Sequence, residues 1–107
     1  MESQHIIVYV TAGSKKEADA LSLGLVEEKL AFCVSALPAV TSTYFWEGKL
    51  CMDEEILLII KTRLSKFDAL ESWVRNNHSY DVPEVIALPI IKGSQPYLKS
   101  IDDWVAE

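Results

Sequence analysis

The sequence predicts one α+β domain over residues 1–107, a ferredoxin-like βαββαβ sandwich with a long β-hairpin and a short C-terminal helix. Three observations lead to this fold class. Extended, β-branched segments alternate with two segments of helical periodicity, an order that places both helices on one face of an antiparallel sheet. Two of the strands are joined by a tight turn into a hairpin. Half of the residues are hydrophobic, which is enough to build a core.

The first part of the chain predicts a strand, a helix and a second strand. Residues 5–11 are β-branched and apolar on both faces, as in an interior strand. Ser14 is predicted to cap a helix that runs to about Leu30, and Glu17 completes a capping box three residues later. Residues 31–37 form the second strand.

The hairpin begins after Pro38, which predicts a kink or bulge because proline cannot donate a ladder hydrogen bond. Aromatic and β-branched residues alternate over residues 40–46, and Gly48 supplies the positive φ of a tight turn. The return arm, residues 49–62, contains an apolar run that is typical of a central strand. These features predict two long antiparallel strands.

The length of the return arm predicts self-association. The arm would span roughly 45 Å at ~3.4 Å per residue, whereas a domain of about 100 residues is only about 35 Å across. Either a bulge folds the arm back onto its own sheet, or the hairpin projects and another subunit covers its apolar residues. Projection predicts Tyr44 and Trp46 as interface residues, with Trp46 as an intersubunit anchor.

The second part of the chain completes the βαββαβ order. Ser65 is predicted to cap a helix that frays near residues 76–77. After a polar loop, residues 84–91 form a strand in which Pro89 marks a sheet edge or a missing hydrogen bond. Residues 97–105 form the short terminal helix.

Composition excludes several classes of function. The formal net charge is −6 and the ten Lys and Arg residues are scattered, so nucleic-acid binding is not expected. No apolar run reaches the ~20 residues of a membrane span, and no secretory signal is visible, so the predicted compartment is the cytoplasm. Cys33 and Cys51 form neither a disulfide framework nor a close metal-binding pair.

The sequence predicts that the protein is not an enzyme. It contains no nucleophile elbow, no phosphate-binding glycine loop and no zinc-protease motif. No pair of residues suggests a nucleophile with an adjacent base. Any function is therefore expected to depend on binding or assembly.

Five residues at strand and loop ends are candidates for a binding site: Lys61, His78, Tyr80, Glu84 and, at the hairpin tip, Trp46, which is either the intersubunit anchor or a ligand-stacking platform. His78 lies on a polar loop where a ring nitrogen can ligate a cation, with Glu84 as an oxygen partner. Two structural alternatives stay open: His78 caps a helix C-terminus, and Glu84 pairs with Lys61. Tyr80 is either a packed loop anchor or, with Lys61, part of a ligand cleft.

Several separated motifs resemble the CutA family of divalent-cation tolerance proteins over nearly the whole chain. They are L-A-F-C-V at 30–34, Y-F-W-E-G-K at 44–49, K-T at 61–62, H-S-Y-D-V-P-E at 78–84 and G-S-Q-P-Y-L at 93–98. The resemblance implies a fold related in shape to PII signalling proteins, a tight homotrimer built through the hairpins, and no catalytic reaction. It also implies a role in divalent metal tolerance, with copper binding in some members.

The chain departs from the ligand pattern of similar copper-binding proteins. Val10 stands where such proteins can have cysteine, and Asn77 stands where they can have a first histidine before His78. Thiolate is the donor best suited to Cu(I), so its absence removes the strongest ligand. Metal binding, of copper or zinc, is therefore expected to be weak, at His78 and Glu84, with no essential cofactor.

Two functions remain open. The first is a trimeric, cation-responsive protein with weak metal binding at His78. The second is a PII-like signalling or scaffold trimer whose intersubunit clefts bind a small anionic ligand near Lys61.

Overall fold

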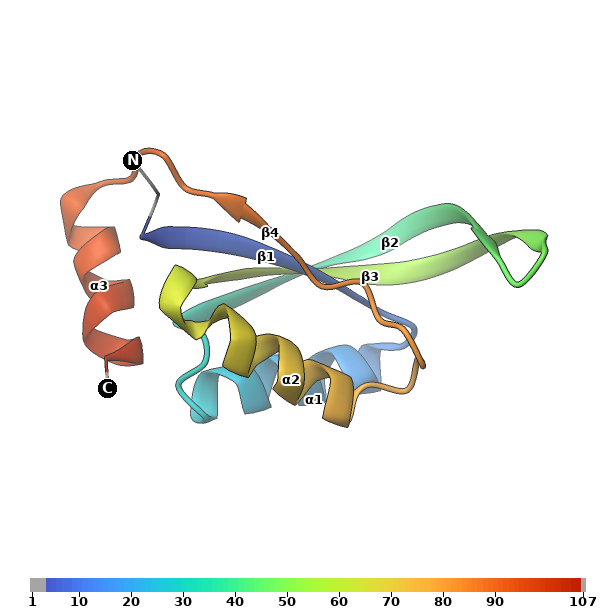
Figure 1. The fold of residues 1–107 in the computed structure, drawn as a ribbon, viewed down its shortest axis with the longest axis horizontal. Helices are drawn as coiled ribbons and strands as arrows, with labels where there is room; N and C mark the ends of the chain where they lie inside the picture. The colour runs from blue at the N-terminus through green and yellow to red at the C-terminus, as the bar shows by residue number, and fades with distance from the viewer. Residues whose placement is uncertain (1–3, 107) are drawn as a thin grey trace.

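The computed structural model describes residues 4–106. Its strands are β1 (His5–Ala12), β2 (Cys33–Trp46), β3 (Lys49–Arg63) and β4 (Ile86–Pro89), and its helices are α1 (Lys15–Glu27), α2 (Phe67–Asn77) and α3 (Gln95–Val105). The strands form one antiparallel sheet in the order β2-β3-β1-β4. Helices α1 and α2 cover one face of this sheet, and α3 lies beyond one end of it (Figure 1). The predicted ferredoxin-like fold class is confirmed.

The core lies between the sheet and the two covering helices. Alternate residues of β1 and β3 point into it and are fully buried, among them Val8 and Leu58. Helix α1 approaches α2 closely at Gly24, where a Cβ atom would lie 2.4 Å from the Trp73 ring. A glycine at this point in the helix is therefore required by packing, although it lowers helix propensity. Among residues 4–106, no helix is long and apolar enough to cross a membrane.

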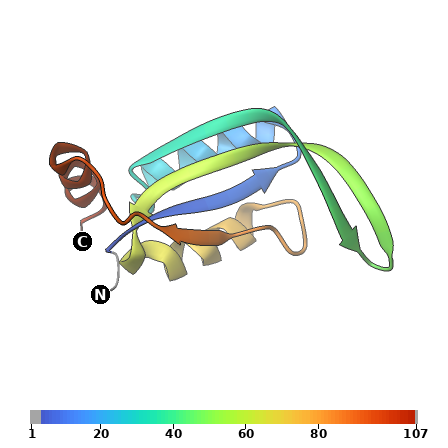
Figure 2. The ribbon, with the colours of Figure 1, turned by 90° about the horizontal axis from the view of Figure 1, so that it is seen from above.

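The β2–β3 hairpin projects from the sheet as a two-stranded ribbon. The last β1–β3 pair is Ala12 with Ile56, and beyond it β2 and β3 continue together to Trp46 and Lys49. Figures 1 and 2 show this ribbon extending past the helices and curving away from the sheet. The molecule is 44 Å long as a result, so the prediction of a projecting hairpin is confirmed.

A bulge separates the two parts of the hairpin. The β2–β3 register shifts between Leu37 and Val40, and Ala39 has a positive φ of 62°. Pro38 is one of the two residues without a partner in the register, as expected for a residue that has no N–H to donate. The predicted bulge is confirmed, but it bends the ribbon and does not fold it back onto the sheet.

Two predictions about helix ends were wrong. Helix α1 ends at Glu27 and not near Leu30, because Lys29 adopts a left-handed φ of 58° that closes the helix. Ser65 does not cap α2: it lies within a 3₁₀ turn, and the residue at the cap position is Lys66, which makes no side-chain cap bond.

The last strand and helix also differ from prediction. Strand β4 covers only Ile86–Pro89, because its pairing with β1 is limited to those four residues. It is an edge strand, as Pro89 predicted. Helix α3 begins at Gln95, two residues before the predicted start, because Ser94 caps it by accepting from the Tyr97 N–H.

Candidate functional site

A groove of about 650 Å³ lies between the base of the projecting hairpin and the loop of residues 80–84. Strand β2 contributes Tyr44 and Trp46 to its lining, and β3 contributes Asp53 and Glu55. Opposed residues of an antiparallel pair point to the same side of the sheet. Asp53 is opposite Ser42, and Ser42 is two residues from Tyr44 on β2, so the Tyr44 ring and the Asp53 carboxylate lie on one face of the ribbon. One face of the hairpin thus forms one wall of the groove, and residues 80–84 line the other side.

The carboxylate of Asp53 is held by a tyrosine on the neighbouring strand. The Tyr44 hydroxyl donates a hydrogen bond to Asp53 Oδ2. This bond raises the pKa of Tyr44 to about 12, because losing the phenolic proton would leave two anions in contact. The phenol therefore stays protonated and continues to donate.

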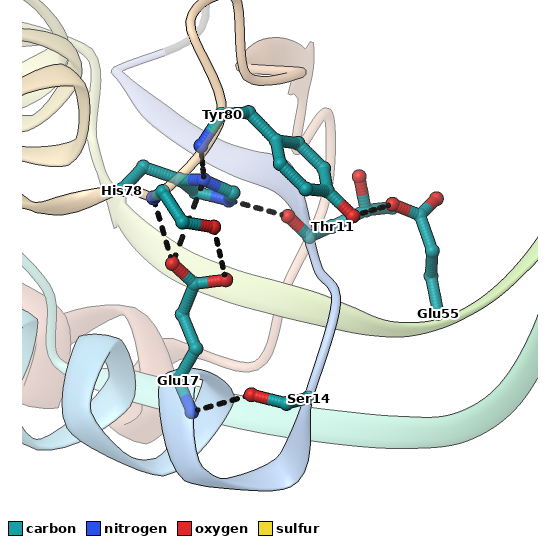
Figure 3. A network of polar contacts seen from close by, with 7 residues as sticks. Thr11, Ser14, Glu17, Glu55, His78 and Tyr80 are labelled. Carbon is teal, nitrogen blue, oxygen red and sulfur yellow. Dashed lines mark hydrogen bonds and ion pairs between the residues drawn. The ribbon is translucent and has the colours of Figure 1, made fainter.

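Glu55 is held in the same way by Tyr80. Its side chain is largely buried where β1 ends, and its Oε2 accepts from the Tyr80 hydroxyl at 2.7 Å (Figure 3). Burial, and then the hydrogen bond to Glu55, raise the pKa of Tyr80. Gly13 lets the tyrosine approach, because a Cβ there would lie 3.0 Å from the Tyr80 hydroxyl oxygen. The hydroxyl of Tyr80 thus connects the loop to the base of the hairpin.

His78 packs against Tyr80 and accepts a hydrogen bond from its backbone. Its side chain is fully buried, and its Nε2 lies 2.7 Å from the Thr11 carbonyl oxygen. A carbonyl only accepts, so Nε2 carries the proton, and Nδ1 accepts from the Tyr80 N–H at 3.0 Å. The two rings are in contact, with centroids 4.6 Å apart. Figure 3 shows the imidazole bridging β1 and the loop.

Glu17 completes this network from α1. Ser14 caps the helix as predicted, by accepting from the Glu17 N–H. The Glu17 carboxylate instead accepts from the N–H and hydroxyl of Ser79, at 2.8 and 3.1 Å. Burial raises the pKa of this carboxyl, but the bonds from Ser79 outweigh it and hold the pKa below its usual value. Helix, loop and hairpin base are therefore joined by one set of hydrogen bonds.

The groove carries excess negative charge. Asp81 and Glu84 join Asp53 and Glu55 in its lining, and among the described residues that line it none is basic. Burial, and then the charge of Glu55, raise the pKa of the Glu84 carboxyl. The site therefore favours cations and disfavours anions.

The structure brings together four of the six residues singled out from the sequence. Tyr44, Trp46, Tyr80 and Glu84 all line the groove, and His78 lies directly behind Tyr80. Lys61 is elsewhere: it lies six residues from Glu55 along β3, about 20 Å at ~3.4 Å per residue. Its Nζ donates to the Ser35 hydroxyl at 2.8 Å and to the Ile59 carbonyl at 3.1 Å.

The arrangement does not fit the expected metal site. Both ring nitrogens of His78 are engaged in hydrogen bonds, whereas a metal ion needs a free nitrogen lone pair. Glu84 lines the groove, and His78 does not. Within residues 4–106, no group of three or more His, Cys, Asp and Glu side chains is placed to hold a metal ion. Coordination by His78 would require the loop to open.

Sequence reasoning missed the carboxylates of the hairpin. Asp53 and Glu55 are separated by one residue on a predicted strand, so the period of two already placed them on one face. The hairpin register then places that face beside Tyr44. The role of Glu17 gave no comparable signal, because its partner Ser79 is 62 residues away in the chain.

Comparison with known proteins identifies relatives of the whole fold. The family described as "CutA1 divalent ion tolerance protein" matches residues 6–106. A protein named "Divalent-cation tolerance protein CutA" from Thermus thermophilus is 42% identical, over 94% of this chain and 94% of that protein. A "Protein CutA homolog" from Xenopus laevis is 52% identical over 92% of this chain, and the chain spans 66% of its length.

Solved structures agree with these sequence matches. The crystal structure of CutA1 from Oryza sativa superposes with a TM-score of 0.94, at 48% identity, and covers 99% of this chain and 97% of that one. A chloroplastic CutA 1 from the same plant is 53% identical over 95% of this chain, which spans 58% of its length. The fold and the sequence are therefore both similar to those of CutA proteins.

Proposed function

The chain belongs to the CutA1 family of divalent ion tolerance proteins, and from this premise we propose that it acts in divalent-cation tolerance as a non-catalytic homotrimer. The observation that carries the proposal is the match to the Thermus thermophilus protein, which bears that name and aligns over 94% of both chains. The acidic groove is consistent with a cationic ligand. Because none of the described residues that line this groove is basic, cation response is the better supported of the two candidate roles.

Exposed apolar surface supports assembly. Ile86 and Leu88 of β4 pair with residues of β1 on the sheet face that α1 and α2 leave open, and both are substantially exposed. The ribbon adds Phe45, Leu50 and Met52, all more than half exposed. Surface of this extent is typical of a protein–protein interface, and a threefold arrangement agrees with the family resemblance.

Metal tolerance is tested in cells. We expect that expressing this chain in a bacterial strain without its own CutA gene will raise the copper, zinc or cobalt concentration that halves growth. The empty vector is the control, and western blotting establishes that the protein is present. Equal sensitivity of the two strains to all three metals, with the protein expressed, would contradict the proposed role.

Direct binding of copper or zinc is proposed to be weak, and His78 is the residue that tests it. Protons compete with metal ions for a histidine nitrogen, so affinity should fall between about pH 7.5 and about pH 5.5. His78→Ala should remove this pH-dependent component in an anaerobic titration, and His5→Ala should not. Isotherms that are unchanged by His78→Ala and collapse with added salt would indicate only diffuse attraction to the acidic surface.

A PII-like role is a second candidate, and Lys61 is the observation that favours it. Its ammonium group bonds to two neutral acceptors, so its charge is not neutralised by these contacts. In an assembly this lysine would be able to bind a small anion. A thermal-shift screen of nucleotides and organic acids tests this, and a shift that Lys61→Met abolishes is the expected result.

The proposed compartment is the cytoplasm. Cys33 and Cys51 are both free thiols, which agrees with a reducing environment. Relatives are not uniform in this respect, since two are named as chloroplastic and one structure is described as periplasmic. Fractionation of cells that express the chain from its natural gene tests the assignment.

A further inference from the structure

We propose that helix α3 is a lid that opens separately from the rest of the chain, hinged at residues 91–94, and that its opening uncovers the Cys33 thiol. This inference goes beyond cation tolerance, and it involves neither the acidic groove nor a metal ion. Figures 1 and 2 show α3 standing apart from the layer formed by α1 and α2, at the end of the sheet where β3 ends.

The packing of α3 is separate from the main core. The buried residues of this helix are Ile101 and Val105. The core between the sheet and the covering helices draws its buried residues from β1, β3, α1, α2 and Ala31, and no residue of α3 belongs to it. Segments that open without global unfolding are those with few buried apolar contacts to the rest of the protein. The packing therefore favours opening of α3 as a unit.

The connection that follows β4 supplies the hinge. The Ile90 N–H donates to the His5 carbonyl oxygen at 2.9 Å and holds the chain to the sheet up to that residue. Residues 91–94 have no regular secondary structure, and Ile91 is 85% exposed. A few loop residues of this kind can absorb the change in φ and ψ that moves a whole helix. Because α3 begins directly afterwards, at Gln95, it would swing from this point.

Helix α3 depends on its docking contacts to remain helical. It has 11 residues, whereas an isolated helix shorter than about 12–15 residues is marginal in water. Its last turn, residues 102–105, carries Asp102 and Asp103 and no basic residue, so both charges lie at the negative end of the helix dipole. Loss of the docking contacts should therefore unwind the end of the helix as well as release it.

One carboxylate fastens the lid to the sheet. Oδ1 of Asp102 accepts from His5 Nε2 at 2.8 Å and also from Arg63 Nη1. Burial raises the pKa of Asp102, but the hydrogen bonds and charges of Arg63 and His5 outweigh it and hold the pKa below its usual value. The docked state thus stabilises the charged carboxylate, so removal of this charge should weaken docking.

Two aromatic residues complete the attachment. Nε1 of Trp104 donates to the Val26 carbonyl oxygen near the end of α1, at 3.0 Å. The Tyr97 and Phe32 rings meet edge to face, with centroids 5.7 Å apart. Burial, and then the charge of an ionised Cys33 and a hydrogen bond with it, raise the pKa of the Tyr97 hydroxyl. This hydroxyl therefore lies beside the half-buried thiol, which loses its cover when α3 opens.

Hydrogen exchange of the full chain, measured at increasing urea concentrations below the unfolding transition, tests for separate opening. We expect the free energy of opening at the α3 amides to fall only slightly with urea, because opening of a lid exposes little surface. Amides of β1 and β3 should follow global unfolding and show its steep urea dependence. An equally steep dependence in α3 would overturn the proposal, because the helix would then open only with the whole molecule.

Asp102→Asn tests the fastening, and Asp103→Asn is its matched control. Each variant removes one charge from the same turn, so each relieves the same unfavourable interaction with the helix dipole. Asp103, however, pairs with Lys99 of α3 itself, at 2.7 Å. Asp102→Asn should speed exchange of the α3 amides about fivefold, or about 1 kcal/mol, at the upper end for partly exposed ion pairs. Asp103→Asn should not speed it, and equal acceleration in both variants would contradict the proposal.

The reactivity of Cys33 tests whether the lid covers the thiol. In a Cys51→Ser background, the Cys33 thiolate attacks the aromatic disulfide dithiobis(nitrobenzoate), forms a mixed disulfide and releases one coloured thiolate. We expect this rate to rise about fivefold in Asp102→Asn, in step with amide exchange in α3, and to stay unchanged in Asp103→Asn. The same rate in all three proteins would show that α3 does not shield the thiol, and the proposal would fail.

Discussion

The two parts of the β2–β3 hairpin are built from the same strands but have opposite surroundings. In the packed part, between the bulge and the start of β2, β3 pairs with β1 and its residues Leu58 and Ile60 are fully buried. In the projecting part, beyond the bulge, Phe45 and Leu50 face each other across the ribbon and are 67% and 81% exposed. The contacts of one chain explain the first set of apolar residues and not the second.

This difference separates the residues that fold the single chain from those that would serve the proposed assembly. A projecting ribbon gains nothing from large apolar side chains unless something covers them. The boundary between the packed and projecting parts lies where β1 ends, at the pair Ala12–Ile56. Glu55 is the first residue of β3 on the projecting side of it. There the network of Glu17, His78 and Tyr80 meets the hairpin.

The largest expected effect comes from replacing one leucine by alanine in each part of the hairpin and comparing the loss of stability. Leu58→Ala removes a fully buried side chain from the packed part and should lower the free energy of unfolding by about 2–5 kcal/mol. Leu50→Ala, in the projecting part of the same strand, should leave the subunit fold intact and weaken only the assembly. Urea unfolding and sedimentation of both variants measure this. Losses in unfolding free energy that are equal and independent of protein concentration would mean that the ribbon is part of the monomer core.

The second prediction concerns the anchor of the projecting part. Trp46→Ala should weaken the proposed trimer by about 2 kcal/mol or more if its side chain is buried by a partner. Sedimentation at low micromolar concentration should show a trimer for the unmodified chain and dissociation for the variant. A compact monomer in the unmodified protein would contradict the assembly, and an unchanged trimer in the variant would place Trp46 at the interface rim.

Most of the fold was predictable from local pattern. The period of two, together with Gly48, gave the hairpin, and Pro38 gave the bulge. The end of α1 was not predictable, because it depends on a left-handed conformation at Lys29, a residue type with no preference for it. The cap of α2 was also missed, since the short 3₁₀ turn before it moves Ser65 away from the cap position.

The candidate site was predictable only in part. Tyr44, Trp46, Tyr80 and Glu84 were singled out separately, and their meeting in one groove depends on the bend of the hairpin toward the loop. The environment of His78 was not predictable, because its partner Thr11 is 67 residues away in the chain. Long-range pairing of this kind leaves no periodic trace in the sequence.

The third prediction tests the boundary between the two parts. His78→Ala leaves the buried Thr11 carbonyl and the Tyr80 N–H without these partners, which should cost about 1–3 kcal/mol of unfolding free energy. His78→Gln keeps a donor near the position of Nε2 and should recover part of this loss. Hydrogen exchange should show faster exchange in the 78–84 loop for His78→Ala. If both variants are as stable as the unmodified protein, the imidazole does not hold the loop.

The smallest expected effect comes from the α1 end of the same network. The Glu17 carboxyl has a lowered pKa in the folded state, because its bonds from Ser79 outweigh burial. A lowered folded pKa means that the stabilisation is present above the unfolded value, near about 4.3, and is lost as the pH falls through the folded value. Glu17→Gln should therefore lower the unfolding free energy at pH 7 by an amount that shrinks toward pH 3.

The measurement is a set of urea unfolding curves for Glu17→Gln at pH values between about 7 and about 3. Glu27→Gln is the control, since Glu27 is an exposed carboxylate on the same helix. The hydrogen bonds of Glu17 to Ser79 tie α1 to the loop that carries Tyr80 and hence to the hairpin base. The variant should also speed exchange at the Ser79 amide. A constant difference across the pH range would show that the charge of Glu17 does not contribute, and the network would then depend on His78 and Tyr80 alone.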